Sequence, residues 1–127
     1  MRWVYKSTLV LYIIALGFGV FTPRPDLVGP NGTPIGHQIL YLGGFWAWVG
    51  NFLMLIPVAY IIHICWPKLF LQTIFITCLT TTISIEFMQL YIPGRVSDVR
   101  DIALNSTGAA LTLLVLHWHK TSKSRAQ

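Results

Sequence analysis

The sequence predicts an all-α polytopic membrane protein: a bundle of four transmembrane helices with both termini in the cytoplasm. Hydrophobic residues make up 54% of the 127 residues and charged residues only 10%. The mean hydropathy of +0.63 is too high for a soluble domain of this size. Four long apolar stretches and the placement of Lys and Arg around them supply the helix number and the orientation. We expect residues 1–127 to form a single transmembrane domain.

The four predicted spans cover residues 4–21, 45–66, 69–90 and 102–118. A bilayer core of about 30 Å requires about 20 apolar helical residues, and each stretch approaches or exceeds that length. The first is interrupted only by Lys6, which can extend its amine toward the head groups. No small-x-small cleavage site follows the first stretch, so we expect a retained helix. The fourth is the shortest and is polar at its start.

The connections between the spans predict the orientation. Residues 22–44 are dense in Pro and Gly, which indicates an outer loop with a short interfacial helix at 35–42. The two termini and the turn at residues 67–68 carry six of the nine cations, namely Arg2, Lys6, Lys68, Lys120, Lys123 and Arg125. The opposite side carries only three arginines, interleaved with aspartates, so the positive-inside rule places the termini in the cytoplasm.

Composition excludes several classes of partner. The net charge of +5 is accounted for by cations beside cytoplasmic helix ends, and no basic stripe interleaved with aromatics predicts nucleic-acid binding. We expect neither a metal nor another cofactor. His37 falls in the outer loop and the other three histidines near cytoplasmic helix ends, so no two of them can join Glu86 in a metal site. Membrane lipids are therefore the expected partners, and the oligomeric state stays open.

Charge is concentrated between Ser84 and Ala109, which holds three of the four carboxylates. Glu86 and Gln89 are three residues apart near the outer end of the third span, so their side chains share one helix face. An ionisable group inside a span costs about 2.5 kcal/mol or more, which places Glu86 toward the bundle or a water-filled cavity. The turn at residues 93–94 then ends the helix.

Three helices contribute to the predicted polar cluster. Asp98 and Asp101 precede or open the fourth span, where carboxylates favour the positive end of the helix dipole. Asn51 and Asn105 lie at a depth similar to that of Glu86, by the helical rise of 1.5 Å per residue. A purely structural interpretation competes for each group: the aspartates as helix caps, the asparagines as interhelical hydrogen-bonding partners, and Arg95 as a counter-charge.

The same residues form a spaced pattern, E-x-x-Q, then P-G-R, then D-x-x-D-x-x-x-N-x-x-G-A. It is carried by Glu86, Gln89, Pro93, Gly94, Arg95, Asp98, Asp101, Asn105, Gly108 and Ala109. This pattern resembles the signature of the VanZ-like family, small bacterial membrane proteins associated with teicoplanin resistance. Asn51 and Pro57 match a second family feature, whereas Ala59 and Thr112 stand where the family often has glycine.

The resemblance implies a protein of the bacterial cytoplasmic membrane that lowers sensitivity to a lipoglycopeptide antibiotic through an envelope change. The residues themselves favour a ligand with a phosphate or sugar head group, because Arg binds phosphate through two hydrogen bonds at once. The predicted ligand-binding residues, on the extracytoplasmic side, are Asn51, Glu86, Gln89, Arg95, Asp98, Asp101 and Asn105.

Three functions remain open at this stage. The first is a non-catalytic envelope protein that binds or masks a lipid-linked cell-wall precursor. The second is an intramembrane enzyme acting on a lipid head group, with Glu86 or Asp101 as the acid or base and Arg95 beside the phosphate. The third is a small proton-linked transporter that uses Glu86 as the carrier.

Overall fold

The computed structural model describes residues 2–23 and 36–125, and all regular structure in them is helical. The helices are α1 (Arg2–Phe21), α2 (Gly36–Met54), α3 (Ile56–Cys65), α4 (Leu71–Gln89) and α5 (Val99–Arg125). Four candidate membrane spans lie within them, Trp3–Phe21, Gly44–Cys65, Leu71–Gln89 and Val99–Lys123. The prediction of an all-helical multi-pass membrane protein is therefore confirmed over the described residues. Most of the predicted outer loop, including Ile35, lies outside them.

The second span, predicted at residues 45–66, consists of two helices with a bend between them. α2 ends at Met54 and α3 begins at Ile56, with Leu55 between them. The cause is Pro57, which has no N–H to donate to the helix turn before it. At this bend the Tyr12 hydroxyl from α1 donates a hydrogen bond to the Met54 carbonyl, at 2.8 Å. A backbone acceptor beside a helix break is thereby satisfied inside the bundle.

α5 begins earlier and ends later than the predicted span of 102–118. The chain leaves α4 at Leu90 and turns at Gly94, whose φ of 76° is a conformation that favours glycine. Asp98 then accepts a hydrogen bond from the Arg100 N–H at 2.8 Å, so the helix is capped before Val99. The first turn and the last turns of α5 are polar. Hydropathy therefore did not include them in the predicted span.

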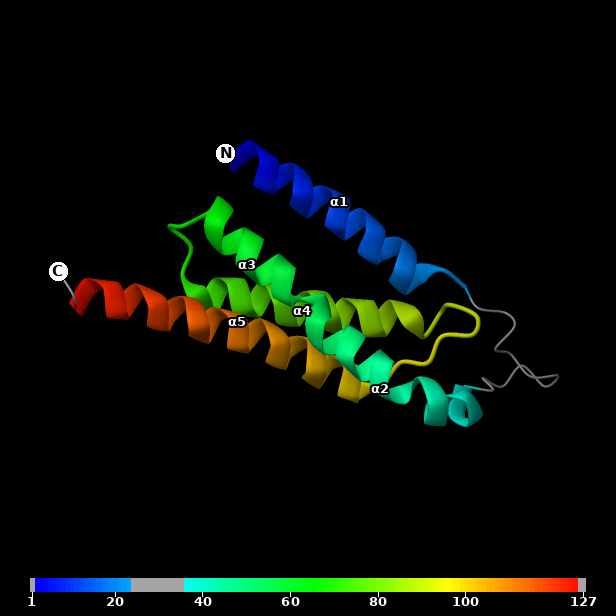
Figure 1. The fold of residues 1–127 in the computed structure, drawn as a ribbon. Helices are drawn as coiled ribbons and strands as arrows, with labels where there is room; N and C mark the ends of the chain where they lie inside the picture. Colours follow the sequence, from blue (N-terminus) through cyan, green and yellow to red (C-terminus); the bar gives the residue numbers. More distant parts are fainter. Residues whose placement is uncertain (1, 24–35, 126–127) are drawn as a thin grey trace.

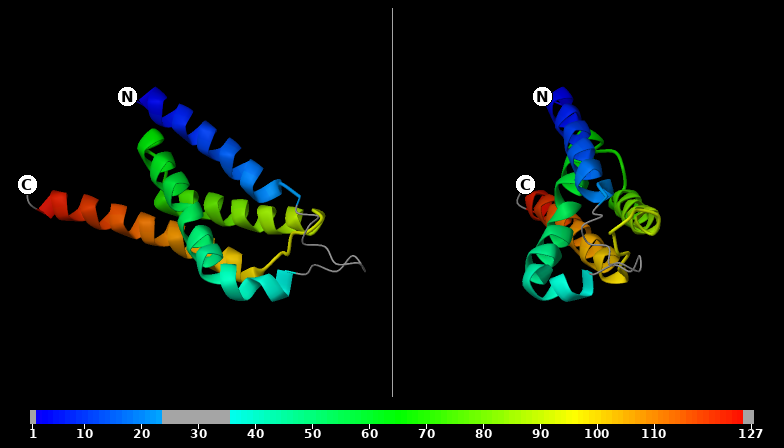
Figure 2. Two further views of the ribbon diagram at one scale, coloured as in Figure 1. Left: turned by 45° about the vertical axis from the view of Figure 1, so that its right-hand side comes forward. Right: turned by 90° about the vertical axis from the view of Figure 1, so that its right-hand side faces the viewer.

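The bundle has two distinct ends. The two chain termini lie at one end, together with the turn between α3 and α4, and the connection between α4 and α5 lies at the other (Figure 1). α5 packs against α2, α3 and α4, whereas α1 packs mainly against α3 (Figure 2). We call the end with the α4–α5 connection the site end. Its assignment to the outside of the cell remains a prediction from the distribution of cations.

Close contact between α5 and the bent span depends on one glycine. A Cβ added to Gly108 would lie 2.0 Å from the Phe52 carbonyl oxygen and 3.3 Å from the side chain of Ile56. Only a hydrogen atom fits between these backbones, as is common where membrane helices cross. Beside it, Ala109 is fully buried. Ala59 of α3 is also fully buried and so occupies a packing position.

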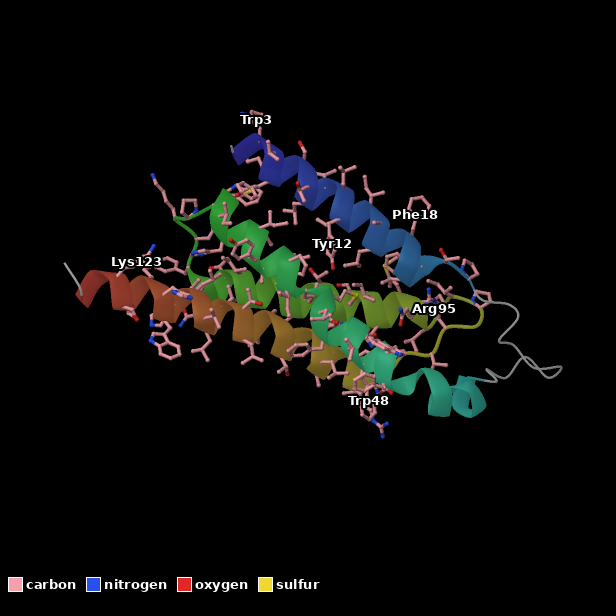
Figure 3. The ribbon with its side chains drawn as sticks, in the orientation of Figure 1. Trp3, Tyr12, Phe18, Trp48, Arg95 and Lys123 are labelled. Atoms are coloured by element: carbon pink, nitrogen blue, oxygen red, sulfur yellow. The ribbon has the colours of Figure 1, made fainter. Side chains whose placement is uncertain are left out.

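α1 is attached more loosely than the other spans. Only 6% of its span is buried, against 22–28% for the other three, and Leu9 is its one buried residue among those described. The Lys6 ammonium lies 5.3 Å from the Trp3 ring centre and 5.4 Å from that of Trp66, which joins the start of α1 to the end of α3. Trp3 and Phe18 point away from the bundle, whereas Tyr12 points into it (Figure 3).

Candidate functional site

Glu86 is the centre of the site. Its side chain is only 4% exposed, which confirms the expectation that it faces the bundle rather than lipid. The carboxylate oxygen Oε2 accepts a hydrogen bond from the Asp98 backbone N–H at 2.8 Å. The Ser97 side chain also hydrogen-bonds to this carboxylate. A buried carboxyl group in α4 thus anchors the end of the connection that leads into α5.

Asp98 and Asp101 have different roles at the start of α5. In the usual capping box, the acid three residues after the cap returns to the backbone N–H of the cap residue. Here Glu86 takes the Asp98 N–H instead, so Asp101 is not needed for that bond. The Asp101 carboxylate instead forms a side-chain hydrogen bond with Asn51 of α2. The D-x-x-D spacing therefore serves both as a cap and as a link between helices.

Three carboxylates on α4 and at the start of α5 act on one another electrostatically. Glu86 and Asp98 both lie close enough to Asp101 for their charges to interact with it. Like charges at such separations repel, and hydrogen bonds from amide N–H groups offset part of this repulsion. Asp98 N–H and the Asn51 side chain provide such bonds. The result is a compact acidic cluster held by α2, α4 and α5.

Asn105 lies deeper in the bundle than we expected. Its Nδ2 donates a hydrogen bond to the Thr82 hydroxyl at 2.8 Å, and both side chains are fully buried. Thr82 precedes Glu86 by four residues on α4, which corresponds to about 6 Å along the helix. Asn105 is therefore paired one turn below Glu86 instead of joining it at one depth. Its Oδ1 accepts no hydrogen bond from the described residues.

Arg95 and Gln89 are directed toward α1. The Arg95 guanidinium donates from Nε to the Thr22 carbonyl at 3.2 Å, and from Nη2 to the Gly19 carbonyl. Gln89 is 8% exposed and approaches the Val20 carbonyl at 3.5 Å. Figure 3 shows Arg95 beside the C-terminal end of α1. A cation beside helix C-terminal carbonyls is electrostatically favourable, so Arg95 ties α1 to the site end.

The seven predicted residues therefore fall into three groups. Glu86, Asp98, Asp101 and Asn51 form one connected cluster, Asn105 pairs with Thr82 below it, and Gln89 and Arg95 contact α1. Sequence reasoning missed Ser97 and the α1 carbonyls. A hydroxyl just before a helix cap is a weak signal, and backbone acceptors leave none. Within the described part of the chain, no three His, Cys, Asp or Glu residues are arranged to hold a metal ion.

These features define the class of the protein as a small helical membrane protein with an acidic and amide-rich cluster at one end. A family model described as VanZ/LLP1 matches residues 9–120, and the chain belongs to that family. The match extends well beyond the motif region, into α1 and the last turns of α5. Neither the curated proteins nor the solved structures include a match to this chain.

Proposed function

We propose that this VanZ/LLP1 family member binds the polar head group of a lipid-linked cell-wall component at the outer face of the bacterial cytoplasmic membrane. Bound there, it limits the access of teicoplanin-type antibiotics to that component. Family membership and the four candidate spans fit a membrane protein linked to this type of resistance. The ligand class and the mechanism are our own inferences, and they rest on the chemistry of the site end.

One observation supports binding rather than catalysis: both candidate catalytic carboxylates already accept hydrogen bonds within the protein. Glu86 is buried and accepts the Asp98 N–H, and Asp101 is bonded to Asn51. A general acid or base needs to reach the proton that it transfers, within about 3 Å or through one water. Both candidates are instead engaged in holding α2, α4 and α5 together. They shape a surface, and we assign recognition to the groups that this surface presents.

The groups presented at the site end suit a phosphorylated head group. Arg100 is exposed in the first turn of α5, close to the positive end of the helix dipole. Arg95 adds a second positive charge to the connection, while its Nε and Nη2 bond to the end of α1, and Tyr91 of the same connection is 74% exposed. Guanidinium groups bind phosphate oxygens in pairs of hydrogen bonds, and an aromatic ring at the membrane interface packs against sugars and lipid.

The enzyme hypothesis retains one supporting observation, the coupling of carboxylates from two helices within one small cluster. Paired carboxylates with different environments are a common acid–base arrangement. Only an enzyme changes the covalent structure of its lipid. Mass spectrometry of lipids extracted from cells with and without the protein therefore distinguishes the two functions, and binding alone predicts identical lipid masses.

The experiment that tests the proposal is antibiotic susceptibility in a Gram-positive host. We would compare the intact protein, an Arg100→Gln variant and a Lys68→Gln variant at matched membrane levels, with teicoplanin and vancomycin. Both substitutions remove one exposed cation, but Lys68 lies in the turn at the opposite end of the bundle. The proposal predicts that protection is lost with Arg100→Gln and kept with Lys68→Gln.

Two results would count against this proposal. Equal protection by the two variants would show that the cations of the site end do not recognise the ligand. No protection by the intact protein would show that antibiotic access is not affected by this chain. A change in lipid mass that disappears with Glu86→Gln would replace the binding function by the enzymatic one.

A further inference from the structure

A second surface feature lies at the opposite end of the bundle from the acidic cluster. A groove of about 490 Å³ runs between α3 and α5 near the chain termini. Tyr60 of α3 forms one wall, and Val115 and Leu116 of α5 contribute apolar side chains. Lys120 and Lys123 line the same groove, and Figure 3 shows Lys123 near the C-terminal end of α5.

The groove changes character along α5. Thr112 is the first lining residue of α5 and Val115 follows it; Lys123 lies eight residues after Val115, about 12 Å further along the helix axis at 1.5 Å per residue. Apolar contact surface therefore lies toward the middle of the span, and cationic groups lie toward its end. A membrane phospholipid has this same order, with acyl chains toward the bilayer centre and a phosphate at the interface.

The charge of the groove is not neutralised by its own helices. The sequence contains no Asp or Glu after Asp101, and α3 contains none. A larger groove of about 570 Å³, between α4 and α5, provides a contrast. It is lined mainly by apolar side chains, including Leu114, and none of its lining residues is Lys or Arg. Of these two grooves, only the α3–α5 groove has Lys side chains that can complement an anion.

We propose that the α3–α5 groove binds one anionic phospholipid. Its phosphate lies between Lys120 and Lys123, and one acyl chain lies along Tyr60, Val115 and Leu116. The bound lipid belongs to the membrane leaflet opposite the acidic cluster, so this site is separate from the head-group site proposed above. The lysines can direct their amines to the phosphate because long cationic side chains extend to the interface along apolar surface.

Native mass spectrometry of the purified full chain tests this proposal. The protein is released from nanodiscs of equal parts dioleoyl phosphatidylglycerol and dioleoyl phosphatidylcholine, and the retained lipid is counted. One retained phosphatidylglycerol is expected. Lys120→Gln and Lys123→Gln should each reduce its retention about tenfold, because each removes a charge-assisted hydrogen bond. Val115→Trp should reduce it as much by filling the groove while the charge is kept.

Two control variants match these substitutions. Lys68→Gln removes one cation at the same end of the bundle but outside the groove, and Leu114→Trp enlarges the neighbouring residue, which lines the α4–α5 groove instead. Both should retain phosphatidylglycerol within about twofold of the unmodified protein. The lysines are exposed, so their replacement leaves the fold intact and the comparison interpretable.

Three outcomes would overturn the proposal. If Lys68→Gln lost as much lipid as Lys123→Gln, general attraction between cations and anionic lipid would explain the binding. If Val115→Trp retained phosphatidylglycerol, the groove would not hold the acyl chain. If phosphatidylcholine were retained as well as phosphatidylglycerol, the lysines would not select an anionic head group.

Discussion

α5 and α1 are both long enough to cross a membrane, but they are held in the bundle to different extents and by different contacts. α5 uses its own side chains and a close backbone contact: Asp101 with Asn51, Asn105 with Thr82, and Gly108 against Phe52. α1 contributes fewer such contacts, the Tyr12 bond to Met54 and the Lys6 contact with Trp66. At its C-terminal end it is held by side chains of other segments that reach backbone carbonyls. Arg95 bonds to those of Gly19 and Thr22, and Gln89 approaches that of Val20.

This difference shows which helix must pack in one fixed position and which need not. Helix association in a membrane cannot rely on the hydrophobic effect, so small residues and polar contacts decide which helices pack closely. α5 has both kinds of contact, and it positions the acidic cluster. α1 has a largely lipid-facing surface and can tolerate change, provided that its end stays beside Arg95. The predictions below test this contrast, beginning with the largest effect.

The same substitution should have opposite effects on the two helices. Gly108→Ala places a methyl group against the Phe52 carbonyl and should destabilise the protein by about 3 kcal/mol. A Cβ added to Gly17 would contact nothing within 4 Å, so Gly17→Ala should be neutral or stabilising by about 0.5 kcal/mol. Reversible unfolding in mixed detergent micelles measures both. Equal stability of the two variants would contradict the contrast between the helices.

Removal of the Glu86 side chain should release the α4–α5 connection. Glu86→Ala leaves the part-buried Asp98 N–H without its acceptor, at a cost of about 1 kcal/mol. Glu86→Gln keeps an acceptor oxygen and should cost less. Amide hydrogen exchange at Asp98 should accelerate strongly in the alanine variant. Ser84→Ala is the control, because Ser84 is exposed and bonds only to the Thr80 carbonyl of its own helix turn. Unchanged exchange at Asp98 would disprove the anchoring role of Glu86.

Variants of two adjacent threonines on α4 compare an interhelical hydrogen bond with one inside a single helix. Thr82→Val removes the buried bond to Asn105 with little change in shape and should cost about 1 kcal/mol. Thr81→Val removes only a bond to the Thr77 carbonyl on an exposed face, so its effect should be near zero. Unfolding measurements on both variants in one detergent provide the comparison, and a larger loss for Thr81→Val would argue against the buried pair.

The smallest effect on global stability is expected for Arg95→Ala. Its hydrogen bonds to α1 are partly exposed, so overall stability should change by less than about 1 kcal/mol. The local effect should be clear, with faster hydrogen exchange of the Thr22 N–H, which closes the last turn of α1. Arg100→Ala should leave that exchange unchanged. Cooperative loss of the whole fold would show that α1 is more deeply integrated than we infer.

Much of the fold followed from physical rules that act locally. Bilayer thickness predicts the spans, and the cost of an intramembrane charge predicts that Glu86 faces inward. The bend at Leu55 was missed because hydropathy does not register the absent N–H of Pro57. The early start of α5 was missed because the capping bond of Asp98 lies in a polar segment. The direction of Arg95 depends on where α1 packs, which no spacing within the motif determines.

The site was predicted as one cluster and is better described as two layers and a link to α1. Spacing along α4 placed Glu86 and Gln89 on one face correctly, and both are buried. Depth estimated from helix ends put Asn105 level with Glu86, although its partner is Thr82, one turn below. The error arose because the start of α5 was placed at 102 instead of Val99. A shift of three residues moves a side chain by nearly one turn.

The measurement that most directly tests the central claim is the side of the membrane on which the site end lies. We would introduce Tyr91→Cys in the α4–α5 connection and, separately, Lys68→Cys in the turn at the opposite end. Both positions are exposed, whereas the native Cys65 and Cys78 are buried. A membrane-impermeant maleimide should label Tyr91→Cys in intact cells and Lys68→Cys only after permeabilisation. The reverse pattern would place the acidic cluster inside the cell and contradict a role at the outer face of the membrane.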